Sequence, residues 1–176
     1  MIKKILNIFF SFFFKKDIFS SHYFINGFMG YKWVARSFLY RNILNLAPTH
    51  EFPVGNNTYV SDFKNIDFSY DDLNNFQSPG CYFQCFRGTI NIGKGTYIGP
   101  NVGLITSNHD PDNLSGHLEA KNITIGKNCW IGMNVMVLPG VVLADNITVG
   151  AGAVVTKSFL SPGISIAGNP AKIISN

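Results

Sequence analysis

The sequence predicts an all-β core, a parallel β-helix of hexapeptide repeats, with an α-helical extension at its N-terminus. The first observation is a six-residue spacing of aliphatic residues in the second half of the chain, at Ile92, Ile98, Leu104, Ile125, Ile131, Val137, Leu143, Val149 and Val155. The second is the glycine that directly follows five of them, at Gly93, Gly99, Gly126, Gly132 and Gly150. A helix repeats about every 3.6 residues and a flat strand every 2, so a period of six indicates short strands joined by tight corners.

A second set of compact residues lies four places after the aliphatic positions, at Thr96, Val102, Cys129, Val135, Val141, Ile147 and Ala153. Stacked turns of such a coil bury both sets in one apolar column, and they pair their backbone groups between successive rungs. The ends of the coil must therefore be capped. We expect an apolar and basic segment with a helix over residues 1–53, the coil over 54–160 and a C-terminal cap over 161–176.

The first residues differ from the coil in charge and in apolar content. Residues 1–45 hold seven basic residues against one acidic residue, a formal charge of +6, so the remainder carries −2 of the total of +4. The apolar run at 5–14 lies between two lysine pairs and is too short to cross a bilayer, which takes about 20 residues. Two interpretations of residues 1–16 stay open, an interfacial segment on a membrane and a helix packed on protein. Residues 31–46 are spaced as an amphipathic helix that ends near Pro48.

Several classes of protein are disfavoured by the residues present. The three cysteines include Cys129 at an inward repeat position, so a disulfide framework is not expected and a reducing, cytoplasmic compartment is favoured. Cys81 and Cys85 lack a second pair of ligands at zinc spacing, and we expect no metal site. Nucleic acid is not an expected partner, because no recognition motif accompanies the basic segment.

The repeat is interrupted once, and the interruption is rich in titratable groups. Leu104 and Ile125 lie 21 residues apart instead of six, and the inserted loop at 105–122 contains His109, His117 and three carboxylates. A regular coil serves as a scaffold, whereas protruding loops carry most binding and catalytic residues. We therefore expect the chemistry of this protein to lie in the loop.

Several strings of the second half, in this order and spacing, resemble one family. They are Ser107 to Asp110, Ile125 to Gly132, Leu138 to Val141, Gly150 to Lys157 and Ala167 to Lys172. Over residues 82–174 the chain is similar to the hexapeptide-repeat acyltransferases, and most closely to sugar O-acetyltransferases of the galactoside and maltose type and their relatives in polysaccharide biosynthesis. The resemblance implies a left-handed β-helix, a homotrimer with active sites between subunits, and acetyl-CoA as the co-substrate.

The resemblance also implies roles for individual residues. The family's catalytic histidine falls on His109, and an imidazole with a reference pKa near 6.5 is suited to take the proton of an attacking hydroxyl. Asp110 is expected to orient this ring or to hold the loop. The expected acceptor contacts are Gln84, Asn108 and His117. The expected contacts of coenzyme A are Trp130, Gly132, Ala151, Thr156, Lys157 and Lys172.

The sequence therefore predicts a transferase that moves an acetyl group from coenzyme A to a sugar hydroxyl, on a polysaccharide or its precursor. An antibiotic acetyltransferase of the same fold stays open, because the loops set acceptor choice. A non-catalytic β-helix scaffold also stays open. A β-helical carbonic anhydrase is disfavoured, because only His109 and His117 of the four histidines lie in the repeat region. If residues 1–16 contact lipid, we expect the protein at the inner face of the membrane.

Overall fold

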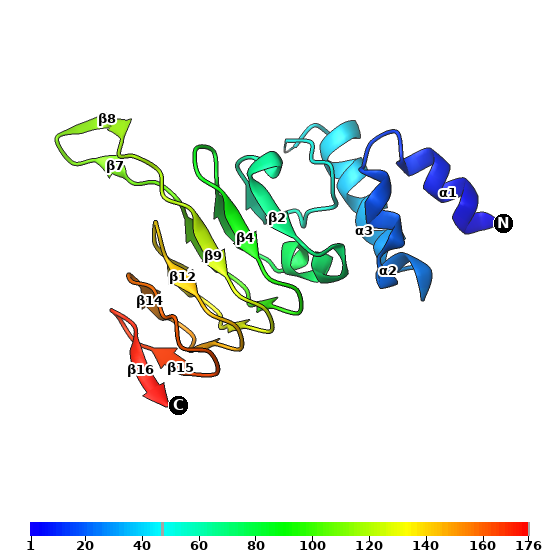
Figure 1. The fold of residues 1–176 in the computed structure, drawn as a ribbon. Helices are drawn as coiled ribbons and strands as arrows, with labels where there is room; N and C mark the ends of the chain where they lie inside the picture. The colour runs from blue at the N-terminus through cyan, green and yellow to red at the C-terminus, as the bar shows by residue number, and fades with distance from the viewer. Residues whose placement is uncertain (47, 176) are drawn as a thin grey trace.

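A computed structural model describes residues 1–46 and 48–175, and its core is a coil of three parallel sheets. The coil winds through the sheets in turn, so that strands of successive turns stack (Figure 1). Sheet A contains β1 (Tyr59–Val60), β3 (Tyr82–Gln84), β6 (Gly103–Ile105), β11 (Met136–Val137) and β14 (Val154–Val155). Sheet B contains β2 (Ile66–Phe68), β4 (Ile90–Ile92), β9 (Ile123–Ile125) and β12 (Val142–Leu143). Sheet C contains β5 (Tyr97–Ile98), β10 (Trp130–Ile131), β13 (Thr148–Val149), β15 (Ser165–Ala167) and β16 (Lys172–Ser175).

The side chains of the hexapeptide pattern fill the interior of this coil. All nine aliphatic lead positions are buried, and so are the seven compact positions four places after them. In the register of the strands, Ile98, Ile131 and Val149 stack on one another in sheet C, and Leu104, Val137 and Val155 do so in sheet A. The expected β-helix is confirmed, and its three parallel sheets are typical of the left-handed form.

The first turn of the coil replaces its third strand with a 3-10 helix, η4 (Tyr70–Gln77). The buried Asn75 lies against the edge strand β5, where its amide donates to the carbonyl of Thr96 and accepts from the N–H of Ile98. Asp72 accepts in the same way from the N–H of Gly95. Side chains of η4 thus satisfy the edge of sheet C that a strand would otherwise pair.

The N-terminal extension is helical and closes the open start of the coil (Figure 1). It contains α1 (Ile2–Phe10), η1 (Lys16–Ser20), α2 (His22–Ile25), α3 (Met29–Phe38) and the π-helical turn η2 (Leu39–Ile43), and η3 (Phe63–Asn65) follows in the coil. The helix expected at 31–46 thus begins two residues earlier and its regular part ends at Phe38. Arg36 donates to Gln77 at 2.6 Å and Tyr23 donates to Asn74 at 2.9 Å, which fixes the extension on η4. No helix of the described residues is long and apolar enough to cross a membrane.

The other end of the coil is covered by the last strand. β15 continues the parallel coil, whereas β16 turns back and pairs with it antiparallel. The region expected to cap the coil therefore begins with one more rung, and β16 covers the end. Asn176, the last residue of the expected cap, lies outside the described residues.

Candidate active site

The inserted loop forms a two-stranded antiparallel hairpin that projects from the corner between sheets A and B (Figure 1). Its strands are β7 (His109–Asp110) and β8 (Asn113–His117), which follow β6 and precede β9. The register pairs His109 with His117, and their ring centroids lie 4.3 Å apart. The two loop histidines that the sequence indicates are therefore neighbours on one hairpin.

The ring of His109 is held by a backbone carbonyl. Its Nδ1 lies 2.9 Å from the carbonyl oxygen of Leu114, across the hairpin. A carbonyl oxygen only accepts hydrogen bonds, so in the neutral ring Nδ1 carries the proton and Nε2 keeps a lone pair. His109 is exposed, and this lone pair is available to a group outside the hairpin. The ring of His109 therefore has one favoured tautomer, with Nε2 able to accept a proton.

Asp110 shapes the turn of the hairpin. Its Oδ1 accepts a hydrogen bond of 2.9 Å from the N–H of Asp112, as in an Asx turn. Asp110 was expected either to orient the ring of His109 or to hold the loop, and this contact holds the loop. The group that contacts the His109 ring is the carbonyl of Leu114. A backbone carbonyl has no signature in sequence, and this partner was therefore missed.

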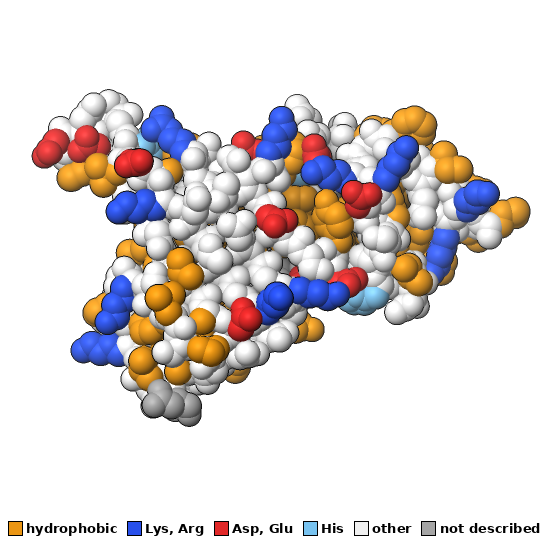
Figure 2. Space-filling model, in the orientation of Figure 1, with side chains coloured by type: hydrophobic (Ala, Val, Ile, Leu, Met, Phe, Trp, Pro, Cys, Tyr) orange, Lys and Arg blue, Asp and Glu red, His pale blue; other side chains and the backbone are white. Residues whose placement is uncertain are grey.

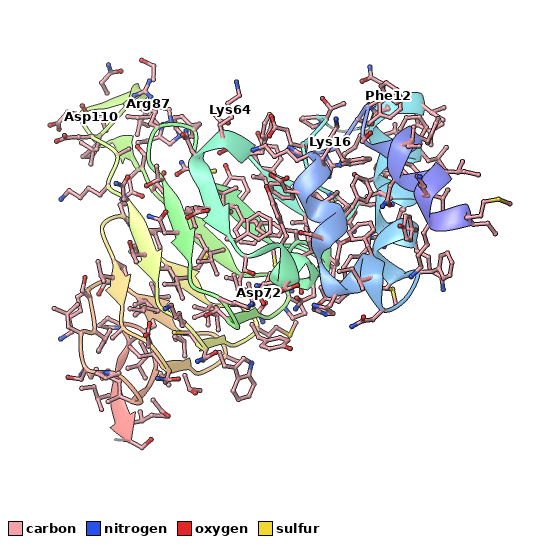
Figure 3. All side chains as sticks on the ribbon, turned by 45° about the vertical axis from the view of Figure 1, so that its right-hand side comes forward. Phe12, Lys16, Lys64, Asp72, Arg87 and Asp110 are labelled. Carbon is pink, nitrogen blue, oxygen red and sulfur yellow. The ribbon has the colours of Figure 1, made fainter. Side chains whose placement is uncertain are left out.

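His117 packs between His109 and the turn that precedes β4. Its ring lies edge-on to Phe86, with the centroids 5.1 Å apart, and Arg87 of the same turn extends beside the hairpin (Figure 3). Partial burial lowers the pKa of His117, and the positive charges of His109 and Arg87 lower this pKa further. The neutral form of His117 is therefore favoured next to His109.

Gln84 fastens the base of the hairpin to the coil. This residue of β3 is buried, and its Oε1 accepts from the N–H groups of Thr106 and Ser107, each at 3.0 Å. Its Nε2 donates to the carbonyl of Ser107 at 2.9 Å. Gln84, expected as an acceptor contact, thus has its amide directed to the backbone two residues before His109.

A hollow lies at the base of the hairpin. It has a volume of about 470 Å³ and is lined by Asn108, Leu118, Glu119, Lys121, Leu138, Pro139 and Thr156. Asn108, expected to contact the acceptor, and Thr156, expected to contact coenzyme A, therefore share one cavity. One residue of each predicted set thus lies at the corner where sheet A ends.

The remaining residues expected to bind coenzyme A lie along the coil. Gly132 stacks on Ala151 at the corner before sheet A, where a side chain at Gly132 would lie 2.7 Å from the backbone nitrogen of Ala151. Trp130 stands on the outer face of sheet C and is 61% exposed. Lys157 follows Thr156, and Lys172 begins β16. Lys157 is therefore next to the hollow, whereas Trp130, Gly132 and Ala151 precede sheet A and are separated from the hollow by it.

No cluster of three potential metal ligands occurs within residues 1–46 and 48–175. Whether the site has room for coenzyme A is judged from the residues at the corner of the coil. Gly132 is buried under the backbone of Ala151, whereas Ala151 is exposed and a side chain at Gly152 would meet nothing within 4 Å, so the surface beside this corner is open to an extended amide-bearing ligand. The residues present fit a pantetheine arm.

Comparison with known proteins agrees with this fold. The family model described as bacterial transferase hexapeptide (six repeats) matches residues 122–157, so this part of the chain has the repeat of the hexapeptide acetyltransferases. It is 39% identical over 89 residues to the galactoside O-acetyltransferase of Escherichia coli K12, covering 49% of this chain and 43% of that protein. It is 38% identical over 87 residues to the "Putative colanic acid biosynthesis acetyltransferase WcaF" of the same strain, covering 49% of this chain and 47% of that protein.

Among solved structures, the chain is similar to a galactoside acetyltransferase in complex with coenzyme A. The TM-score is 0.52 at 34% identity, and the match covers 70% of this chain and 64% of that one. The chain thus spans about half the length of the curated relatives and less than two thirds of this structure.

Proposed function

We propose that this protein transfers an acetyl group from acetyl-CoA to a hydroxyl of a sugar, in a polysaccharide or its precursor. The observation that carries the proposal is the contact of His109 Nδ1 with the carbonyl of Leu114, which leaves Nε2 as the proton acceptor one residue after Asn108, a residue that lines the hollow. Two relatives of one bacterium, a galactoside O-acetyltransferase and a putative colanic acid biosynthesis acetyltransferase, support the reaction and the substrate class.

In the proposed mechanism, Nε2 of His109 takes the proton as the sugar oxygen attacks the thioester carbon. The carbon–sulfur bond breaks, the acetyl group stays on the sugar oxygen, and the proton passes from the imidazole to the departing thiolate. Coenzyme A supplies the activated acetyl group. Asn108 and His117 line the acceptor side, Gln84 and Asp110 hold the hairpin, and Trp130, Gly132, Ala151, Thr156, Lys157 and Lys172 contact the coenzyme.

We further propose a homotrimer in which each site lies between two chains. The outward positions of sheets A and C are apolar and exposed at Tyr82, Met136, Tyr97 and Trp130. The outward row of sheet B is more polar, with Asp67, Asn91 and Thr124 beside Val142. Exposed apolar rows of this kind favour contact with another subunit. A neighbour against sheet A would also join the two groups of coenzyme contacts that one chain leaves apart. A cytoplasmic location is part of the proposal.

The test is release of free thiol from acetyl-CoA by wild type and His109→Ala against simple sugars, nucleotide sugars and isolated glycans. We expect acceptor-dependent release that falls about a hundredfold or more in the variant, as loss of a general base predicts. Full turnover by His109→Ala would contradict the role of His109. Release only with aminoglycoside or other drug acceptors would favour an antibiotic acetyltransferase, and failure to bind acetyl-CoA would favour a scaffold.

A further inference from the structure

The helix α1 has two apolar faces, and only one of them packs on the protein. Phe10 is 6% exposed and, with the half-buried Leu6, it faces the rest of the extension, where Asn7 accepts a hydrogen bond from Tyr31. The opposite side is apolar as well: Ile2, Ile5 and Ile8 of α1 are exposed, and so is Phe12, two residues past the helix, while the partly exposed Phe9 also contacts the ring of Phe38. Ile2, Ile5 and Ile8 recur every three positions, so they lie on one side of the helix.

This second face, which we call the outer face, is open to solvent. Ile5 is 59% exposed and Phe12 is 79% exposed, among the largest values for apolar residues of the chain. Phe12 lies at the helical end of the molecule, far from the end that carries Arg87 and Asp110 (Figure 3). Burial of these residues in the fold therefore does not explain their apolar character.

Basic side chains border the outer face. Lys4 lies on α1 itself, and Lys16 lines a shallow groove of about 290 Å³ together with Ile8, Ser11 and Phe19. Neither lysine forms an ion pair with the described part of the chain, in contrast to Lys15, which pairs with Glu51 at 2.6 Å. Figure 2 shows apolar and basic side chains side by side over this end of the molecule.

From this geometry we propose that the outer face of α1 docks on an anionic lipid surface. Apolar side chains at the centre with lysines at the border match a bilayer interface, where the rings enter the headgroup boundary and the ammonium groups meet lipid phosphates. The helix is nine residues and about 14 Å long, so it lies in the plane of the interface.

The charges favour lipid over a second copy of the chain as the occupant. A symmetric pair of outer faces would bring the Lys4 and Lys16 of two chains together, and like charges at such a contact repel. An anionic surface instead attracts the whole extension, because residues 1–45 carry a formal charge of +6. The hairpin with His109 stays clear of the surface, since it projects from the other end of the molecule (Figure 1).

The experiment is co-sedimentation of the full chain with vesicles of equal parts phosphatidylglycerol and phosphatidylcholine, compared with pure phosphatidylcholine. We expect binding to the anionic vesicles, and loss of this binding in Ile5→Ser/Phe12→Ser. The matched control is Leu160→Ser/Ile174→Ser, which changes two equally exposed apolar residues at the other end of the coil. Lys4→Gln/Lys16→Gln should weaken binding about fivefold for each lysine, with Lys64→Gln/Lys127→Gln unchanged.

Three results would overturn the proposal: no binding to anionic vesicles, equal binding to both lipids, and full binding by Ile5→Ser/Phe12→Ser. The last part of the experiment measures the mass of the protein by sedimentation without lipid. A larger mass for wild type than for Ile5→Ser/Phe12→Ser would mean that a second copy covers the outer face. Acetyl transfer to a soluble acceptor should be the same in all these variants, so failure of lipid docking is distinguishable from failure of the proposed reaction.

Discussion

The coil and the helical extension use apolar residues in different ways. In the coil, the aliphatic residues of the hexapeptide pattern all point inward, and Ile131 is fully buried. In the extension, α1 directs Phe10 to the protein but Ile5 and Phe12 to solvent. An apolar residue in the sequence therefore indicates a buried position only where the repeat of the backbone fixes the direction of its side chain.

The largest expected effect comes from a matched pair of truncations, Ile131→Ala in the coil and Ile5→Ala in α1. We expect Ile131→Ala to lower the free energy of unfolding by about 2–5 kcal/mol, because it leaves a cavity among stacked rungs. Ile5→Ala should change it by less than about 0.5 kcal/mol, since Ile5 is 59% exposed. Denaturant unfolding at one protein concentration measures both, and equal losses would remove the distinction between the two regions.

The junction of the two regions provides a prediction on pH. His50 is buried there, and burial, together with the charge of Arg41, lowers its pKa from 6.5 to about 4. Between these values the unfolded chain binds a proton that the folded chain does not, so stability is lost as the pH falls from 6.5 to 4. The loss from this group is up to about 3 kcal/mol. His50→Gln should show a smaller decrease over this range, and identical pH profiles would contradict the prediction.

A pair of glycine substitutions tests how closely the corners of the coil pack on one another. A side chain at Gly93 would lie 2.5 Å from the backbone of Gly126 in the next turn, whereas nothing lies within 4 Å at Gly27 in the extension. We expect Gly93→Ala to destabilise by about 1–3 kcal/mol through overpacking. Gly27→Ala should be neutral or slightly stabilising, because it restricts the unfolded chain. A neutral Gly93→Ala in thermal unfolding would show that the turns separate easily.

The smallest expected effect concerns the attachment of the hairpin to the coil. Gln84→Ala removes the acceptor of the Thr106 and Ser107 N–H groups and should let the hairpin move relative to the hollow. We expect the rate of acetyl transfer to fall about tenfold, with the affinity for acetyl-CoA unchanged. Steady-state kinetics with calorimetry of acetyl-CoA binding separates these quantities, and an unchanged rate would show that Gln84 does not position His109.

The fold was predictable because each inward position of the coil is marked by residue type at a fixed spacing. Residues 92–155 are the clearest case, and the loop with His109 stood out as the one break in that spacing. The first turn was less regular because Asn75 of η4 satisfies the edge of sheet C with its side chain, which no strand pattern reveals. The outer face of α1 was not predictable, since a helix that is apolar on two sides does not indicate which side packs.

The site was predictable in its main residue but not in its geometry. His109 was marked by the interrupted repeat and by resemblance, whereas its partner is the carbonyl of Leu114, a group that every residue carries. Gln84 was singled out for its place near the loop, but only the fold reveals that its amide is directed to the backbone of Thr106 and Ser107. Sequence identifies side chains, and the hairpin register then determines which backbone groups they meet.

The most direct measurement is the tautomer of His109 by nitrogen NMR of protein labelled at its histidine rings, with His109→Gln to assign the signal. The contact with Leu114 predicts that the neutral ring carries its proton on Nδ1 and leaves Nε2 unprotonated as the base. A proton found on Nε2 of the neutral ring would contradict the proposed mechanism, because the exposed nitrogen would then have no lone pair for the sugar hydroxyl.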